Sequence, residues 1–259
     1  MFYKYMDRSG VDLLKNLRLL AKPPNLLNDP WECDPSVNFD TDPNRIYDLL
    51  NSDRFASLQT AKGLKPLKPS RAIVADIKQR APMILAEARR SLSERINNHR
   101  LACLSFRNDG ILLWAYYACG HRGFVVGLKG FALGGRSDTA VLKVGYSAKR
   151  QSIGNILGVD TDQRVKSLLK SFQTKSEEWR HEQEVRIIGH SEAFVTVDNK
   201  SYFPLDPAII DCVIIGSRCP QDLCDEIGEV LRSNPDLRHV RKLRANVEAD
   251  RFAITILPS

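Results

Sequence analysis

The chain contains no run of about eighteen consecutive apolar residues, the length that a helix needs to cross a bilayer. Its first residues, MFYKYMDRSGVDLL, also lack the basic start and the continuous apolar core of a secretion signal. We therefore expect neither a membrane span nor export, and we predict a cytoplasmic protein.

Cysteine is scarce and scattered. None of the six cysteines forms a CxxC pair, and the closest two, Cys219 and Cys224, have no histidine beside them. This pattern is typical of reduced thiols in a cytoplasmic protein and argues against a zinc site. We expect no metal cofactor.

Aromatic residues are absent between Ala61 and Arg100, the most basic part of the chain. This segment holds ten Lys and Arg against three Asp and Glu, which equals the formal net charge of +7 for the whole protein. The preceding stretch, Ala21 to Thr60, carries seven acidic and three basic residues. The basic segment predicts either a solvated helix face or a surface for phosphate, including nucleic acid. The lack of aromatic side chains that could stack on bases favours the solvated face.

The remaining pattern predicts an α+β fold with a mixed, mainly antiparallel β core in one domain, residues 1–259, carrying a mainly helical insertion at about 42–100. Expected helices cover Asn44 to Ser57 and Ser70 to Asn97, the second kinked or divided at Pro82. A further helix, LLWAYYA, is apolar on nearly every face and is expected to be buried. Strands are expected at residues 2–5, 17–20, 101–106, 124–128, 141–146, 182–188, 193–197, 212–216, 240–247 and 251–257.

The stretch KSEEWRHEQEVRII, which ends at Ile188, places unusual charge on an apolar strand. Strand side chains alternate faces, so Glu182, Glu184 and Arg186 are predicted to share one face. Two interpretations follow: an exposed face with a weak surface ion pair, or a charged row that lines a cleft.

Three further clusters accompany that stretch. Tyr3 and Tyr5 share one face of the first strand, with Lys4 on the other. NDPWE is a turn, because Asn and Asp form side-chain turns and Pro sets the bend. Ser105 lies on a strand just before the aromatic helix. Each cluster alone is consistent with a purely structural role.

In combination, these motifs resemble the bacterial family catalogued as domain of unknown function 2971. The matching residues are Tyr3-Lys4-Tyr5, Asn28-Asp29-Pro30-Trp31-Glu32, Ser105, Trp114-Ala115-Tyr116-Tyr117-Ala118, Gly123-Phe124, and Trp179, Glu182, Glu184 and Arg186. The resemblance spans Tyr3 to about Gly216, apart from the basic helical insertion. Leu113 stands where the family has Met, a change that conserves volume.

The layout of that family is similar to the ADP-ribosyltransferase superfamily, which carries a polar first-strand residue, a serine strand and a late glutamate. The resemblance implies an enzyme that uses NAD as substrate, either an ADP-ribosyltransferase or an NAD glycohydrolase, with a role as a bacterial defence or toxin effector. It implies Glu184 as the catalytic carboxylate, assisted by Glu182. The nucleotide cleft would hold Tyr3, Lys4, Tyr5, Ser105 and Arg186. No clean H-Y-E or R-S-E triad is readable in the chain.

A fixed carboxylate would suit that chemistry, because cleavage of the nicotinamide–ribose bond develops positive charge on the ribose. One alternative is a non-catalytic module that binds nucleic acid or a protein partner through the basic segment. Another is a nuclease with Asp29, Glu32, Glu182 and Glu184 around a divalent cation.

Overall fold

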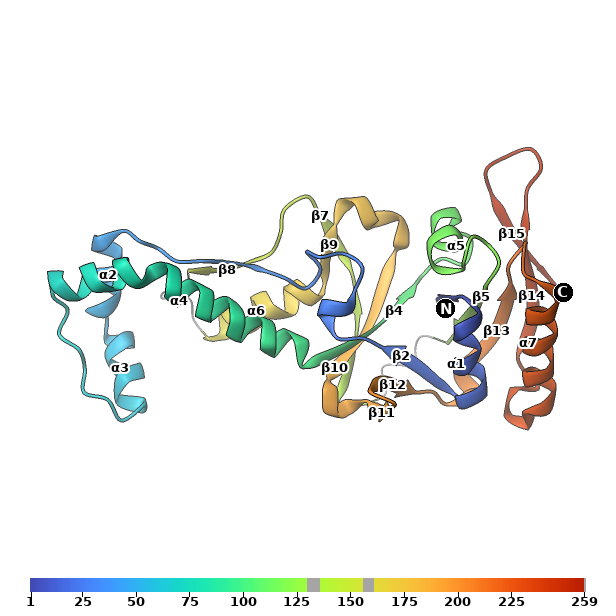
Figure 1. The fold of residues 1–259 in the computed structure, drawn as a ribbon, viewed down its shortest axis with the longest axis horizontal. Helices are drawn as coiled ribbons and strands as arrows, with labels where there is room; N and C mark the ends of the chain where they lie inside the picture. Colours follow the sequence, from blue (N-terminus) through green and yellow to red (C-terminus); the bar gives the residue numbers. More distant parts are fainter. Residues whose placement is uncertain (130–135, 156–160, 259) are drawn as a thin grey trace. The chain divides into compact units, whose positions relative to one another are not determined.

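The protein is described from a computed structural model that covers residues 1–129, 136–155 and 161–258 (Figure 1). The chain divides into two compact units. The first consists of Met1–Asn28, Asn97–Ala148 and Lys175–Ser259, and the second of Asp29–Ile96 and Lys149–Thr174. The single domain with an insertion at about 42–100 stays a prediction.

An eight-stranded sheet forms the centre of the first unit. Its spatial order is β15 (Ile254–Pro258), β14 (Arg241–Val247), β13 (Ile210–Ile215), β5 (Phe124–Leu128), β1 (Phe2–Met6), β4 (His99–Ser105), β10 (Glu184–His190) and β6 (Thr139–Lys143). Neighbours pair antiparallel except β13 and β14, which are parallel. The predicted α+β class with a mixed, mainly antiparallel sheet is therefore confirmed.

Each face of this sheet is covered by its own apolar cluster. On one face, α7 (Gln221–Ser233) and α1 (Val11–Asn16) contribute Leu223, Ile227 and Leu14 to a core that includes Val185 and Ile187. On the other face, α5 (Ile111–Tyr117) packs Leu113 and Trp114 against Tyr5 and Ile214. The buried residues recur at the spacing that puts them on one face: every second residue in the strands, and every third or fourth residue in the helices.

The expectation that the aromatic helix is buried on nearly every face is wrong. Leu113 and Trp114 are buried, but Ile111 and Leu112 are exposed and Tyr116 is 62 % exposed. The cause is geometric: a two-turn helix on the surface of a sheet can bury only the side that faces the sheet.

Smaller sheets complete the first unit. One holds β11 (Val195–Val197), β12 (Lys200–Pro204) and β2 (Arg18–Ala21), and another pairs β7 (Gly145–Ser147) with β9 (Thr174–Ser176). The 3-10 helices of this part of the chain are η1 (Arg8–Gly10), η2 (Pro24–Leu26), η4 (Glu177–Glu182), η5 (Ser191–Ala193), η6 (Pro207–Ile209) and η7 (Pro235–Leu237).

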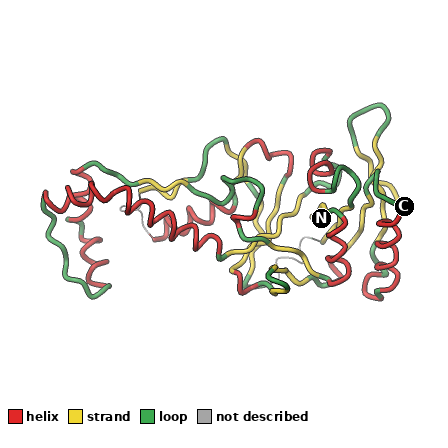
Figure 2. The backbone as a smooth tube through the Cα atoms, viewed as in Figure 1, coloured by secondary structure: helices red, strands yellow, loops and turns green. Residues whose placement is uncertain are grey.

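Helices dominate the second unit. They are α2 (Pro43–Leu50), α3 (Asp53–Ala61), α4 (Arg71–Asn97) and α6 (Thr161–Phe172), and α4 ends one residue beyond the unit. The unit also contains the parallel strand pair β3 (Ser36–Asn38) and β8 (Ser152–Asn155). The helix predicted from Asn44 to Ser57 is two helices, because Ser52 ends the first and caps the second by accepting from the Phe55 backbone N–H. Pro82 does not divide α4, which stays helical through it (Figure 2).

No helix within the described residues is long and apolar enough to cross a membrane.

Candidate functional site

Three neighbouring strands bring together three of the residues predicted for the site. Tyr3 on β1 is the register partner of Ser105 on β4, and Ser105 is in turn the partner of Glu184 on β10. Directly opposed residues of antiparallel strands point to the same face of a sheet. Positions far apart in the sequence therefore form one row across the sheet.

Glu184 forms a buried ion pair with Arg186, which lies two residues further along β10. Arg186 Nε lies 2.7 Å and Nη2 3.2 Å from the two carboxylate oxygens of Glu184, and the two side chains are 0 % and 3 % exposed. The interpretation as a weak surface pair is thus wrong. Removing one partner of such a pair strands the other charge in an apolar interior, which is far more costly than losing a surface bridge.

Lys175, the first residue of the quoted stretch, joins the two glutamates. It lies on β9, and its Nζ is 2.6 Å from Glu182 Oε2 and 3.0 Å from Glu184 Oε2. Burial alone would lower the pKa of Lys175, but Glu184 and Glu182 more than offset burial and hold it above its ordinary value. The sequence analysis gave Lys175 no role, although it is the lysine that opens the stretch KSEEWRHEQEVRII.

Burial and the charge of Lys175 shift the pKa of Glu184 in opposite directions. Desolvation raises the pKa of Glu184 above the usual range, while the charge of Lys175 lowers it. Two carboxylates and two cations make up the group, so its formal charge balances. We name these four side chains, Lys175, Glu182, Glu184 and Arg186, the charged cluster.

Glu182 does not lie on the strand, contrary to the predicted alternation. It ends the 3-10 helix η4, and Gln183 then adopts a left-handed backbone conformation with φ of 43° before β10 begins at Glu184. Ser105 fixes this turn: its hydroxyl donates to the Glu182 carbonyl at 2.6 Å and accepts from the Arg107 backbone N–H at 3.0 Å. Ser105 therefore acts as a positioning residue for Glu182.

A hydrogen-bonded chain connects Glu182 to an exposed side chain. Asn28 donates to the Tyr117 hydroxyl at 2.9 Å, and Tyr117 donates to Glu182 Oε1 at 2.5 Å. Burial, together with Glu182, raises the pKa of Tyr117, so the phenol stays protonated and keeps its donor role. Glu182, rather than Glu184, is thus the carboxylate with a polar route to the surface.

Two more aromatic side chains frame the charged cluster. Tyr146 on β7 accepts from the Glu184 backbone N–H at 2.8 Å, and burial raises its pKa to about 12. The ring of Trp179 lies under Lys175, whose Nζ is 4.8 Å from the ring centre. A cation above an aromatic face is electrostatically favourable, which adds to the fixed position of Lys175.

The other first-strand residues take structural positions. Tyr5 is buried, donates to the Arg107 carbonyl at 2.9 Å and packs edge-on against Trp114, so it lies in the core rather than in a cleft. Lys4 is half-buried and donates to the Cys103 carbonyl at 2.8 Å, and burial lowers the pKa of its amine. Arg186, fully buried, holds Glu184 and has no face toward solvent.

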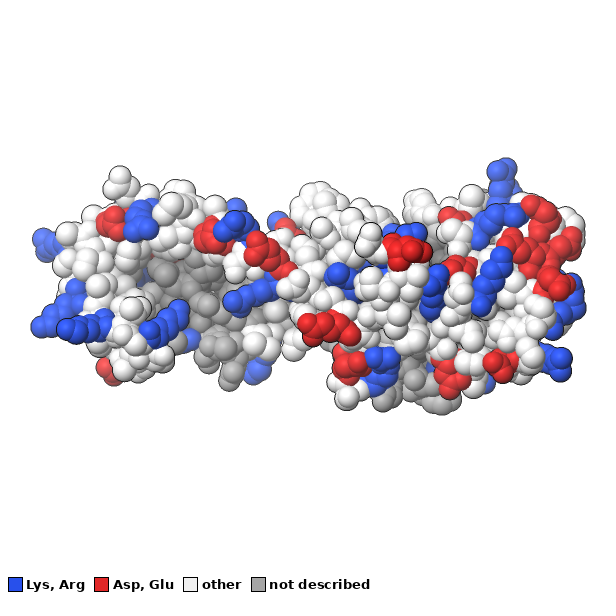
Figure 3. Space-filling model, turned by 60° about the horizontal axis from the view of Figure 1, so that its bottom comes forward, with Lys and Arg blue, Asp and Glu red and all other residues white. Residues whose placement is uncertain are grey.

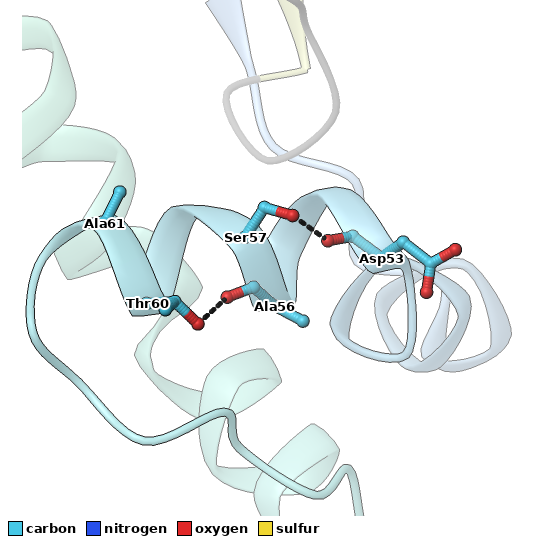
Figure 4. A pocket seen from close by; sticks show the side chains of 5 residues that line it. All are labelled: Asp53, Ala56, Ser57, Thr60 and Ala61. Carbon is cyan, nitrogen blue, oxygen red and sulfur yellow. Dashed lines mark hydrogen bonds between the residues drawn. The ribbon is translucent and has the colours of Figure 1, made fainter.

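A pocket of about 480 Å³ lies along α3 in the second unit (Figure 4). Asp53, Ala56, Ser57, Thr60 and Ala61 line it. Both of its hydroxyls already donate within the helix, Ser57 to the Asp53 carbonyl and Thr60 to the Ala56 carbonyl. This pocket therefore offers a ligand little polar chemistry.

Residues 1–129, 136–155 and 161–258 hold no group of three or more His, Cys, Asp or Glu side chains placed to bind a metal. No family model, no curated protein and no solved structure matches the chain. The resemblance to the bacterial family accordingly rests on the quoted motifs.

Proposed function

We propose that the protein is an NAD-consuming enzyme of the ADP-ribosyltransferase type, acting at the charged cluster. The observation that supports this is the row formed by Tyr3, Ser105 and Glu184 on three adjacent strands. Their residue types and their order along the chain are those expected from the resemblance. The three residues are register partners across one sheet.

The two carboxylates would have different roles in this reaction. Cleavage of the nicotinamide–ribose bond needs a fixed negative charge near the carbon that becomes cationic. Glu182 is the better group for direct contact, because Tyr117 and Asn28 link it to the surface. Glu184, anchored by Arg186 and Lys175, would hold Lys175 and thereby the orientation of Glu182.

The substrate would have to replace an existing contact of Glu182. Its Oε1 accepts from Tyr117 and its Oε2 from Lys175. The Tyr117 bond is the one nearer the surface, so a ribose hydroxyl that takes its place would keep the carboxylate hydrogen-bonded. The ring of Tyr117 would then be free to contact the leaving nicotinamide.

Charge removal at either glutamate tests the proposal. Glu182→Gln and Glu184→Gln keep the side-chain size, and each is expected to reduce nicotinamide release from NAD by at least about a hundredfold, the scale of losing one electrostatic stabiliser. Release is measured with candidate protein and nucleic-acid acceptors present. Glu178→Gln, on the exposed part of η4, is the matched control and should retain full activity.

Stability must be measured beside turnover, because both variants leave buried cations with fewer partners. NAD binding by the folded variants separates a chemical role from a folding defect. A wild-type protein that neither binds NAD nor releases nicotinamide would disprove the enzymatic proposal. Unchanged activity per folded molecule in both variants would make the charged cluster structural.

A second candidate function is nucleic-acid binding by the second unit. The side chains of Lys78, Arg80, Arg89, Arg90 and Arg95 on α4 are all exposed. Figure 3 shows Lys and Arg side chains at the surface of the part of the chain that holds α2 and α3. Exposed cations along a long helix favour contact with phosphates.

Charge reversal of Arg89, Arg90 and Arg95 together tests this second function. If α4 binds nucleic acid, the triple Glu variant should lose at least tenfold in affinity at low salt, and wild-type affinity should fall steeply as salt rises. Fluorescence anisotropy with labelled single-stranded and double-stranded oligonucleotides measures both. Affinity that does not depend on salt, or no binding at low salt, would leave α4 as a solvated face.

A further inference from the structure

A pocket of about 390 Å³ lies between α7, η7 and β14, on the face of the sheet that α7 covers. Its lining includes three cationic side chains, Arg232, Arg238 and Lys242. Lys242 belongs to β14 at the level of Val213, a residue of the core beneath α7, so its side chain points toward the helix. The three cations thus come from three consecutive elements.

Within the described residues, a carboxylate pairs with only one of these three cations. Arg232 pairs with Glu229 at 2.8 Å across the exposed helix surface. Among the described residues, the structure records no ion pair or side-chain hydrogen bond for Arg238 or Lys242. The position of Arg232 in the last turn of α7 is explained by the helix dipole, but that dipole explains neither of the other two cations.

Gly228 opens the floor of the pocket. It is buried in the interior of α7, where glycine costs about 1 kcal/mol relative to alanine. A methyl group there would meet Arg232 Nη1 at 3.3 Å and Lys242 Nζ at 3.8 Å, with no backbone atom in its way. Packing therefore does not require glycine at this position. The missing side chain leaves space directly beside two cations.

Apolar side chains form the rest of the lining. Leu237 is fully buried, and Leu231 and Val240 are nearly so. Two cations without a recorded ion pair, Arg238 and Lys242, beside an apolar floor match a ligand with one strongly anionic group and one apolar body. Arg232 Nη1 and Lys242 Nζ lie 3.3 Å and 3.8 Å from the position that a Cβ of Gly228 would take, so both cations reach the pocket beside the same glycine.

We propose that this pocket binds a small phosphate monoester whose other part is apolar. The site is independent of the charged cluster and of the NAD chemistry proposed there. Arg232 and Lys242 would hold the phosphate, Arg238 would add charge at the rim, and Leu231 and Val240 would contact the apolar part.

Calorimetric titration with phenyl phosphate and with inorganic phosphate tests the pocket without using a nucleotide, which could also enter the NAD site. Phenyl phosphate is expected to bind at least tenfold more tightly than inorganic phosphate, because only phenyl phosphate can bury apolar area against Leu231 and Val240. Equal affinities, or no binding of either compound at millimolar concentration, would overturn the proposal.

Three variants locate the binding. Lys242→Gln and Arg238→Gln should each weaken phenyl phosphate binding at least tenfold. Gly228→Ala should weaken it as well, while the melting temperature stays equal or rises, because alanine favours the helix. Arg251→Gln, which removes an exposed cation outside the pocket, is the matched control. If Arg251→Gln weakens binding as much as Lys242→Gln, or if Lys242→Gln binds like the wild type, the pocket is not the site.

Discussion

Replacing Lys175 by methionine is expected to lower the free energy of unfolding by about 3–5 kcal/mol at neutral pH. The substitution keeps the volume but removes the cation that contacts both Glu182 and Glu184. Glu184 keeps Arg186, whereas the side chain of Glu182 keeps, within the described residues, only the neutral hydroxyl of Tyr117. A carboxylate with no cation in an interior of low polarity accounts for the size of the loss.

The loss should shrink as the pH falls. Lys175 lowers the pKa of Glu184, so its removal lets burial raise that pKa further. A carboxyl group whose folded-state pKa exceeds its unfolded value destabilises the fold above the folded value and ceases to do so below the unfolded value, about 4.3. Urea unfolding of the wild type and of Lys175→Met, measured from pH 7 down to pH 4, should therefore give converging curves.

Two controls separate the cluster from a general effect of losing charge. Lys65→Met removes an exposed lysine and should change stability by less than about 0.5 kcal/mol. Adding Glu182→Gln to Lys175→Met should recover part of the loss, because it removes the stranded carboxylate. If the double variant is less stable than Lys175→Met by the full cost of Glu182→Gln alone, the two side chains are not coupled.

The elements of the site could be predicted from the sequence, but their contacts could not. Local signals sufficed to predict strands near β1, β4 and β10, since each is a short, largely apolar run with a Gly, Asn or Asp near its end. That Tyr3, Ser105 and Glu184 share one level depends on the register of two strand pairs far apart in the sequence. Register is fixed by the packing of whole faces, which no short window contains.

Glu182 shows a different limit. The alternation of strand side chains predicted Glu182 on the strand. This prediction was wrong because Gln183 takes a left-handed conformation that residues other than glycine seldom adopt. The hydrogen bond from Ser105 to the Glu182 carbonyl compensates for that turn, and it joins residues 77 positions apart. Tertiary contacts thus overrule the local pattern at the residue we propose for catalysis.

Trp114→Ala is expected to lower the free energy of unfolding by about 3–5 kcal/mol, the range for removing a large buried aromatic side chain. Trp114 is fully buried and packs edge-on against Tyr5 with ring centres 5.4 Å apart. Its Nε1 donates to the Asn108 carbonyl at 2.8 Å, which the variant would leave without that donor. Urea unfolding followed by circular dichroism measures the change.

Tyr116→Ala is the control on the same helix, because Tyr116 is 62 % exposed and its loss should cost less than about 0.5 kcal/mol. The contrast tests whether α5 buries one side only. A Trp114→Ala variant that loses under about 1 kcal/mol would contradict the burial of the ring.

Because α5 also carries Tyr117, displacement of this helix should release Glu182 from its hydrogen bond to Tyr117. The Trp114→Ala protein is therefore expected to lose any NAD-cleaving activity together with its stability, whereas Tyr116→Ala should keep the positions of both Tyr117 and Glu182.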